Sequence, residues 1–415
     1  MSLNKQNILA SFILLYLVSY DFLFFNLEEI FDTKLFILKI FFEFITLIVF
    51  VAYFVYLTKF FRFHLSLIFL IAVICFCICY GFSLNQDIVS IIKEFRMFFL
   101  PMLFGLLFHS LRIFGPINIE KLIFSYISIS FILILFGFYE FIVFDGTVDS
   151  IWRYDFLLQA KKDLKPDYLE HKVIYQVLRN GSIRVSSLFI SALDYSFYVA
   201  MLGILTFIMI VKLNKIYFIP LFISVLFSLY ISQVRTGFIL LILGVLIFFL
   251  LNSKIKLLYL LSFLVPFIAI IGTFIVMISG SSLNDTSSIG RLVQYYQLIN
   301  DFTLLGGGMG RYANEFDSLY IYILLTYGVF SMLFFYFQYW IVIKLIKINN
   351  AISKSFIGSY EIVLVQFMII FHLVSLYLFA FQNSLGAPTF FLLYFFSFII
   401  ISKVNYNLNN KLLYE

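Results

Sequence analysis

Long apolar stretches alternate with short polar segments along the whole chain. Most of them approach the ~20 residues that a helix needs to cross a bilayer. The pattern predicts twelve membrane-spanning helices, at residues 7–26, 34–57, 63–83, 89–110, 119–143, 186–211, 216–231, 236–252, 255–279, 317–345, 359–381 and 386–402. Because open sheet edges cannot be satisfied in hydrocarbon, the expected fold is an all-α polytopic integral membrane protein.

Composition leaves little room for a soluble domain. Of the 415 residues, 63% are hydrophobic and 12% are charged, and the mean hydropathy is +1.06. A soluble domain is about 25% charged. We therefore expect residues 1–415 to form a single transmembrane domain with two larger outer loops, 144–185 and 280–316. The net charge of +6 reflects basic residues beside the spans, so we expect no nucleic-acid partner.

Basic residues mark one side of the membrane. They gather in the segments near 59–62, 112–121, 212–215, 254–256 and 344–354. The positive-inside rule places these segments, and both termini, in the cytoplasm. Arg184, Arg235 and Arg291 fall on the opposite side, which suggests an anionic substrate there. Arg96, near the outer end of its span, is a fourth candidate for the same site.

The seventh and eighth spans, 216–231 and 236–252, are short and meet at Ser232–Thr236. Two short paired spans reach poorly across ~30 Å of hydrocarbon. This predicts a recessed outer turn that carries Arg235 into a protein-lined cavity. The alternative is an ordinary turn whose arginine reaches up to the membrane surface.

The two outer loops contain their own predicted helices. In the first loop, residues 151–178 are able to form a helix at the membrane surface. In the second loop, good N-cap residues precede a predicted helix over 289–302, with an apolar and aromatic face that includes Tyr295. The glycine run 306–310 follows this helix and predicts a flexible turn.

The residue types exclude several chemistries. The four histidines lie in separate segments, and the three cysteines lie in one apolar run, so the sequence predicts no metal site. The glycine run lacks the Lys-Ser/Thr of a phosphate loop. We therefore expect neither a metal nor a cofactor. His372 lies in the middle of a span, where we expect a hydrogen-bonded core histidine more than a catalyst.

The remaining chemistry combines arginines with an acid. Arginine binds phosphate oxygens through two N–H groups, and a nearby carboxylate can take a proton from an attacking hydroxyl. Asp317 and Glu315 are the candidate bases, although Asp317 also fits a helix N-cap. Tyr295, Tyr312 and Tyr320 offer rings on which sugars can stack, although tyrosines also collect at membrane interfaces as anchors.

Four short segments, together with the layout of twelve spans and two outer loops, carry a resemblance to a known family. The segments are Arg184–Phe189, Ser232–Gly237, Ser288–Arg291, and the run Gly306–Gly310 followed by Asp317–Tyr320. In their order and sidedness they resemble the bacterial O-antigen polymerase (Wzy) group, within the O-antigen polymerase and ligase superfamily.

The resemblance implies a metal-independent membrane glycosyltransferase of lipopolysaccharide biosynthesis in the bacterial inner membrane. Such an enzyme transfers a growing glycan from undecaprenyl pyrophosphate to a hydroxyl of a new lipid-linked repeat unit at the periplasmic face. The family also implies membrane lipids and a chain-length regulator protein as partners. Arg184, Arg235, Arg291 and Arg96 would then bind the pyrophosphate.

Two other functions stay open. Ligases of the same superfamily carry a histidine at the end of the second outer loop, where this chain has Glu315 and Asp317, which favours a polymerase. A flippase for lipid-linked oligosaccharides would show two related halves with short outer loops. This chain shows two sizeable outer loops and no internal repeat.

Overall fold

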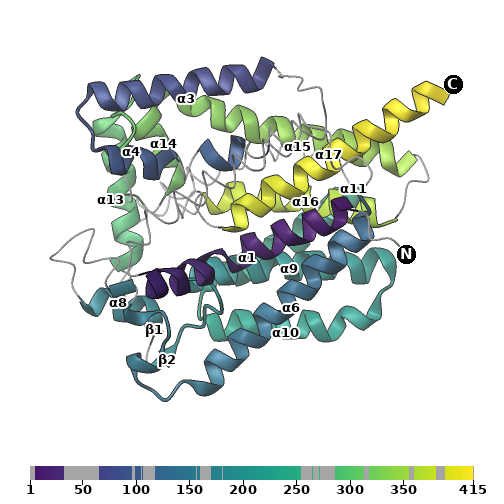
Figure 1. Cartoon of the computed structure of the whole chain (residues 1–415), viewed down its shortest axis with the longest axis horizontal. Helices are drawn as coiled ribbons and strands as arrows, with labels where there is room; N and C mark the ends of the chain where they lie inside the picture. The colour runs from purple at the N-terminus through teal and green to yellow at the C-terminus, as the bar shows by residue number, and fades with distance from the viewer. Residues whose placement is uncertain are drawn as a thin grey trace. The chain divides into compact units, whose positions relative to one another are not determined.

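The structure is a computed structural model, and it describes most of the chain. The described residues are 5–31, 65–95, 99–103, 105, 117–155, 157–158, 170–179, 181–253, 264, 271, 286–312, 316, 318–354, 359–379 and 388–414. Helices dominate this part of the chain, which also contains one two-stranded sheet (Figure 1). The predicted span 34–57 lies outside the described residues, as does nearly all of 255–279.

Several of the described helices suit a membrane. Four are long and apolar enough to cross one: Ile119–Val143, Ala192–Leu213, Leu319–Ile352 and Tyr360–Leu378. Shorter apolar helices are found at Gln6–Tyr20, Ala72–Ser83, Ile216–Ser232, Arg235–Leu251 and Phe391–Val404. The described residues therefore form a mostly helical protein with the composition of a membrane-embedded chain.

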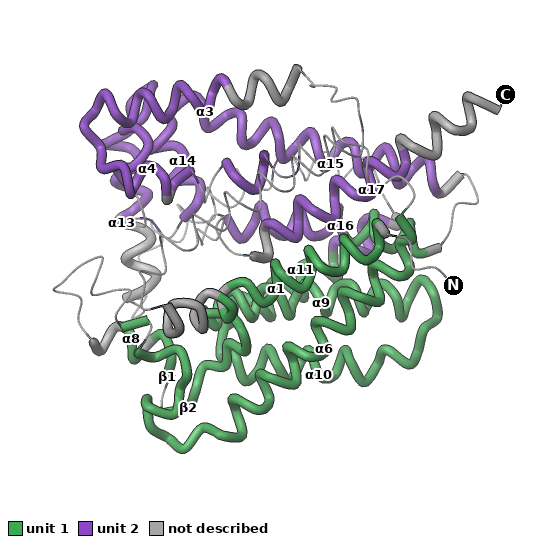
Figure 2. The backbone as a smooth tube through the Cα atoms, in the orientation of Figure 1, with its two compact units in different colours: residues 1–59, 116–246, 358–367 green, residues 60–115, 247–357, 368–415 purple. Residues whose placement is uncertain are grey.

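The chain divides into two compact units, each assembled from three separate stretches (Figure 2). Unit 1 comprises Met1–Lys59, Pro116–Leu246 and Gly358–Phe367, and unit 2 comprises Phe60–Gly115, Ile247–Ile357 and Met368–Glu415. The two units thus alternate along the sequence instead of following one another as an N-terminal and a C-terminal half.

Unit 1 is built around α6 and α9. Its described elements are α1 (Lys5–Phe31), α6 (Ile119–Val143), η2 (Val148–Ser150), α8 (Glu170–Val177), β1 (Leu178–Arg179), β2 (Ser182–Ile183), α9 (Ala192–Leu213), η3 (Ile216–Phe218), α10 (Ile219–Ser232) and most of α11 (Arg235–Ser253). α6 packs against α1, α9 and α10, and α9 packs against α10. α9 is buried at most of its positions, which makes it the centre of this unit.

Caps explain where the central helices of unit 1 begin. The Asn118 side chain accepts a hydrogen bond from the backbone N–H of Lys121 (3.1 Å) and starts α6. Asn118 also exchanges two hydrogen bonds with the Asn7 side chain, at 3.0 and 3.2 Å, which join α6 to α1. Ser191 caps α9 in the same way, through the backbone N–H of Leu193 (3.1 Å). Each cap satisfies a backbone donor that has no partner within its own helix.

Unit 2 contains the other described helices. These are α3 (Leu65–Ser83), α4 (Ile88–Glu94), α13 (Thr286–Asp301), α14 (Leu319–Tyr327), η4 (Gly328–Phe330), α15 (Ser331–Lys354), most of α16 (Ser359–Leu378) and α17 (Pro388–Tyr414). α13 covers residues 289–301 of the predicted helix 289–302 and begins three residues earlier. The apolar segment Leu319–Ile352, which contains most of the predicted span 317–345, begins as α14, which ends at Gly328 (φ +51°), and continues as η4 and α15.

A buried polar network joins three helices of unit 2. His372 of α16 hydrogen bonds through Nδ1 to the Gln338 side chain of α15 (3.0 Å) and through Nε2 to the Ser397 hydroxyl of α17 (2.9 Å). Gln338 in turn donates to the Tyr394 hydroxyl. Both ring nitrogens of His372 therefore have partners, as expected for a core histidine.

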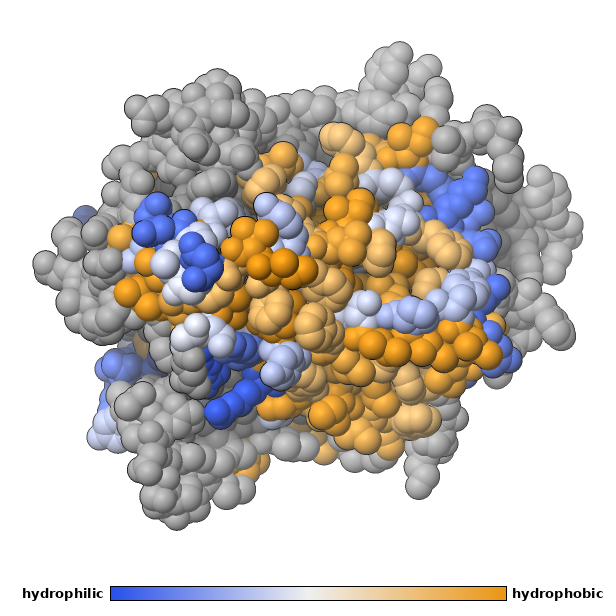
Figure 3. All heavy atoms as spheres, turned by 90° about the horizontal axis from the view of Figure 1, so that it is seen from below, coloured by the Kyte–Doolittle hydropathy of each residue, from blue (hydrophilic) through white to orange (hydrophobic). Residues whose placement is uncertain are grey.

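Apolar side chains also cover a large part of the described residues on the face seen in Figure 3. In unit 1 they come from three helices, α6, α10 and α11. Exposed large apolar residues include Phe131, Ile132, Leu135 and Ile142 of α6, Ile223, Leu226 and Phe227 of α10, and Ile239, Ile242 and Leu246 of α11. A soluble monomer rarely exposes so continuous an apolar surface, whereas lipid tails cover one at no cost.

Candidate functional site

A short β-hairpin lies at the end of the segment 144–185 and carries two arginines. β1 and β2 pair antiparallel, with Leu178 opposite Ile183 and Arg179 opposite Ser182. The backbone N–H of Arg184 continues this register by donating to the carbonyl oxygen of Val177 (2.8 Å). Because side chains alternate between the two faces of a strand, Arg179 and Arg184 belong to one face of the hairpin.

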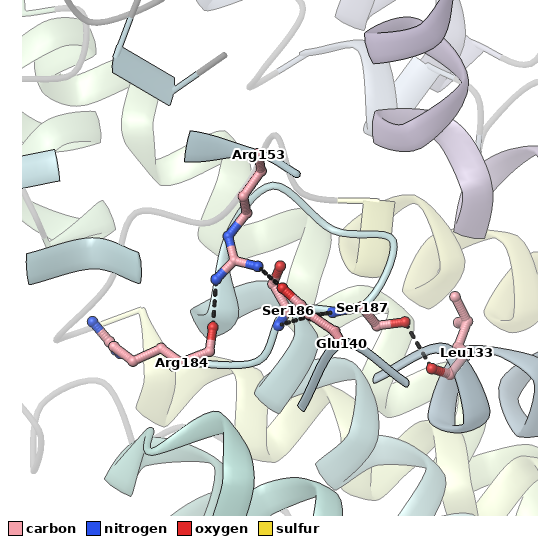
Figure 4. Close-up of polar contacts among 6 residues, drawn as sticks. All are labelled: Leu133, Glu140, Arg153, Arg184, Ser186 and Ser187. Carbon is pink, nitrogen blue, oxygen red and sulfur yellow. Dashed lines mark hydrogen bonds and ion pairs between the residues drawn. The ribbon is translucent and has the colours of Figure 1, made fainter. Parts of the chain in front are cut away.

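Directly after the hairpin, the chain meets a buried ion pair. Arg153 of the segment 144–185 is 0% exposed and donates through Nη1 to Oε1 of Glu140 on α6. Its second nitrogen, Nη2, donates to the carbonyl oxygen of Arg184. The other carboxylate oxygen of Glu140 accepts from the backbone N–H groups of Ser186 (2.9 Å) and Ser187 (2.8 Å), as Figure 4 shows. One ion pair thus fixes the backbone from residue 184 to residue 187.

The charges of this pair are held in a low-dielectric setting. Burial lowers the pKa of Arg153, and the neighbouring Glu140 carboxylate opposes that shift. Such a pair contributes little net stability, because both ions lose their water, yet removal of one partner typically costs about 3–5 kcal/mol. The pair therefore restricts the position of the bonded backbone strongly, although its net contribution to the stability of the fold is small.

The turn after Arg184 is held in an unusual conformation. Ser187 has a φ of +54°, in the left-handed region that non-glycine residues seldom adopt. Its hydroxyl donates to the carbonyl oxygen of Leu133 on α6 (2.7 Å), and its N–H donates to Glu140. These bonds hold Ser187 in this conformation and keep the turn against α6.

The same segment lies against the turn between α10 and α11. The backbone N–H of Val185 donates to the carbonyl oxygen of Ile231 (3.3 Å), and Nη1 of Arg179 donates to the carbonyl oxygen of Gln233 (3.3 Å). Gln233, with a φ of +54°, ends α10, and Arg235 starts α11. The segment that carries Arg184 and the turn that carries Arg235 are therefore neighbours.

These arginines differ in exposure. Arg235 is exposed, and Arg179 and Arg184 are half-buried. The Arg184 side chain extends away from Glu140 and Arg153 (Figure 4), whereas the Arg184 carbonyl oxygen is hydrogen bonded to Arg153. The Glu140 charge is meanwhile matched by Arg153. This arrangement can present several cations to one anionic group.

The other residues predicted for the site are placed only in part. Arg291 belongs to α13 of unit 2, and its side chain is outside the described part of the structure. Arg96, Glu315 and Asp317 also lie outside the described residues. The N-cap of α14 is Ser318, whose hydroxyl accepts from the backbone N–H of Ile321 (3.5 Å). The capping role considered for Asp317 is therefore carried out by its neighbour.

The three tyrosines proposed to stack on sugars are all buried in this structure. The Tyr320 hydroxyl donates to the carbonyl oxygen of Leu376 (2.5 Å), and the Tyr295 hydroxyl lies 3.3 Å from that of Ser318. The Tyr312 ring packs under the Arg311 guanidinium, 5.2 Å from its centroid. Their contacts here are internal packing contacts, whereas Tyr296 on α13 is 61% exposed.

The glycine run between α13 and α14 is bonded along its length. The N–H groups of Gly307 and Gly308 donate to the carbonyl oxygens of Leu325 (2.7 Å) and Thr326 (3.2 Å). The N–H of Gly310 donates to the buried Glu94 carboxylate of α4 (2.6 Å). The turn that was expected to be flexible is thus hydrogen bonded to α14 and to α4 in this structure.

The function of this region is indicated neither by a metal-binding cluster among the described residues nor by a similar protein. The described residues contain no group of three or more His, Cys, Asp and Glu side chains that would hold a metal ion. No protein-family model, curated protein or solved structure matches the chain. A functional interpretation therefore depends on the residues and their geometry.

Sequence reasoning missed two features of this region. It did not pair Arg153 with Glu140, and it did not include Arg179 among the site residues. A signal existed for Glu140, since an acid within a predicted span needs a partner. No spacing rule selects Arg153 from the seven lysines and arginines of the loop 144–185.

Proposed function

We propose that the chain is a membrane glycosyltransferase of the O-antigen polymerase type, acting on undecaprenyl pyrophosphate-linked oligosaccharides. The observation that supports this proposal most is the contact between the Arg184 segment and the Arg235 turn, through Val185 and Ile231. It brings two of the predicted pyrophosphate ligands onto adjacent backbone segments of one unit.

In this proposal the arginines act on the leaving group. A hydroxyl of the incoming repeat unit attacks the anomeric carbon of the growing glycan, and the bond from that carbon to the pyrophosphate oxygen breaks. Undecaprenyl pyrophosphate leaves with the bonding electrons. Arg184 and Arg235, with Arg291 and Arg96 as further candidates, neutralise the developing charge, which guanidinium forks do well.

The proton of the attacking hydroxyl needs an acceptor. Asp317 is the proposed base, with Glu315 as its substitute, because both precede α14 next to the pinned glycine run. Since Ser318 is the N-cap, Asp317 is not required for that role. The sugars would be bound by aromatic side chains of the second outer loop, where Tyr296 is exposed and Tyr295 and Tyr312 are buried, and by Tyr320 of α14, which is also buried.

The proposed location follows from the charge pattern. The protein would be a multi-pass protein of the bacterial inner membrane, with both termini in the cytoplasm and the site at the periplasmic face. A flippase is less well supported, because repeat-built transporters join two related halves in sequence. The two units of this chain instead alternate along it.

Loss of the protein from its own bacterium tests the class. A polymerase mutant places single repeat units on its glycolipid, a ligase mutant accumulates complete polymer on the carrier lipid, and a flippase mutant retains single units on the cytoplasmic face. We expect the first pattern, restored by the wild-type gene. Either of the other two patterns would replace the proposed function.

A further inference from the structure

We propose that Glu140 and Arg153 are positioning residues for the anion site: the buried pair fixes the backbone of Arg184 so that its guanidinium meets the lipid pyrophosphate. This inference depends on the proposed function for its ligand. Neither residue would touch the ligand itself, because both side chains are buried.

The pair hydrogen bonds to backbone groups of residues 184, 186 and 187. Arg153 bonds the carbonyl oxygen of Arg184, and Glu140 bonds the next two available N–H groups, of Ser186 and Ser187. Glu140 stands on α6, whereas Arg153 belongs to the loop that precedes the hairpin. The two side chains therefore link the loop that contains Arg153, the backbone of residues 184–187 and helix α6.

The choice of residue types agrees with a positioning role. A carboxylate near an anion site would repel the ligand, but the charge of Glu140 is matched by Arg153 and is buried. The two bonds of Arg153 diverge from one rigid guanidinium, one to a carboxylate and one to a carbonyl. A lysine carries a single nitrogen and cannot reproduce that fork. Arg153→Lys is therefore a mild variant that keeps the charge and loses the geometry.

The position of the segment is measurable without any ligand. Val185 and Ile341 are both fully buried, in unit 1 and unit 2 respectively. In the full-length chain with Cys75, Cys77 and Cys79 replaced by Ala, a cysteine at position 185 or 341 reports local opening through its rate of maleimide labelling. Glu120→Gln serves as a control, because Glu120 is an exposed acid at the other end of α6.

We expect Arg153→Lys and Glu140→Gln to raise labelling at position 185 about tenfold and to weaken binding of farnesyl pyrophosphate, a short lipid pyrophosphate, by about tenfold. Labelling at position 341 should stay slow, and Glu120→Gln should change neither measurement. The proposal is overturned by unchanged labelling at 185, by equal acceleration at 185 and 341, or by unchanged affinity when 185 opens. If the wild-type protein binds no farnesyl pyrophosphate, the proposed function fails, and labelling at 185 still decides whether the pair fixes the segment.

Discussion

Val185 donates its backbone N–H to the carbonyl oxygen of Ile231, at 3.3 Å. This bond joins two segments that are more than forty residues apart and that each carry an arginine, Arg184 on one side and Arg235 on the other. Because the backbone on the Arg184 side is also fixed by Glu140 and Arg153, the first of these arginines is held by the core of unit 1.

Arg179 is expected to contribute to the same site. It shares a face of the β-hairpin with Arg184, and its guanidinium already donates to the carbonyl oxygen of Gln233 beside Arg235. Arg179→Ala should weaken binding of a lipid pyrophosphate by about tenfold, the loss expected for one charged hydrogen-bond donor. Titration of the purified protein measures this, and an unchanged affinity would remove Arg179 from the site.

Asp317→Asn separates catalysis from capping. Asparagine cannot accept a proton from a hydroxyl, so we expect this variant to insert normally and to leave single repeat units on the carrier lipid. Ser318→Ala is the matched control, since it removes the observed N-cap of α14 and should cost about 1 kcal/mol of stability without abolishing polymerisation. Complete polymer from Asp317→Asn would leave Glu315 as the candidate base.

Gly306 should tolerate no side chain. Its φ is +77°, and a Cβ there would lie 2.3 Å from the carbonyl oxygen of Thr326. Gly306→Ala combines a left-handed backbone with this clash, so we expect it to lower stability by about 3 kcal/mol or more. Gly146 has a φ of +94° and open space around its Cβ, so Gly146→Ala should cost only about 1–2 kcal/mol. Thermal unfolding in detergent compares the two, and equal losses would refute the packing argument.

Topology is predicted from charge alone and is tested by labelling in intact cells. Asp149 and Ala351 are both exposed, Asp149 in the segment 144–185 and Ala351 in the basic end of α15. In a cysteine-free chain, a membrane-impermeant maleimide should label a cysteine at 149 and not one at 351. The reverse pattern would place the arginine site on the cytoplasmic side and contradict the proposed chemistry.

The sequence predicted some elements closely for clear physical reasons. The helix over 119–143 was predicted with the bounds of α6, because Asn118 caps its start and polar Asp145-Gly146 follows its end. The break at Gly328 was missed, because apolar residues continue on both sides of it and hide the change in backbone direction.

The site was predicted less completely than the helices. The sidedness of basic residues selected Arg184 and Arg235, whose segments the structure brings together. Their support by Glu140 and Arg153 depends on how a loop folds back onto a span, which no periodicity encodes. The burial of Tyr295 and Tyr320 likewise depends on tertiary packing, because a tyrosine at an interface and one in a core look alike in sequence.

Polymerisation by the purified protein tests the central claim most directly. Supplied with lipid-linked repeat units extracted from its own bacterium, the wild-type protein should form polymer. Arg184→Ala and Arg235→Ala should each lower the rate by about a hundredfold, and Lys at either position should restore little, because it lacks the bidentate fork. Lys212 lies in the last turn of α9, whereas Arg184 precedes the first turn, so Lys212→Ala should leave the rate unchanged. Wild-type rates from both arginine variants would contradict the account.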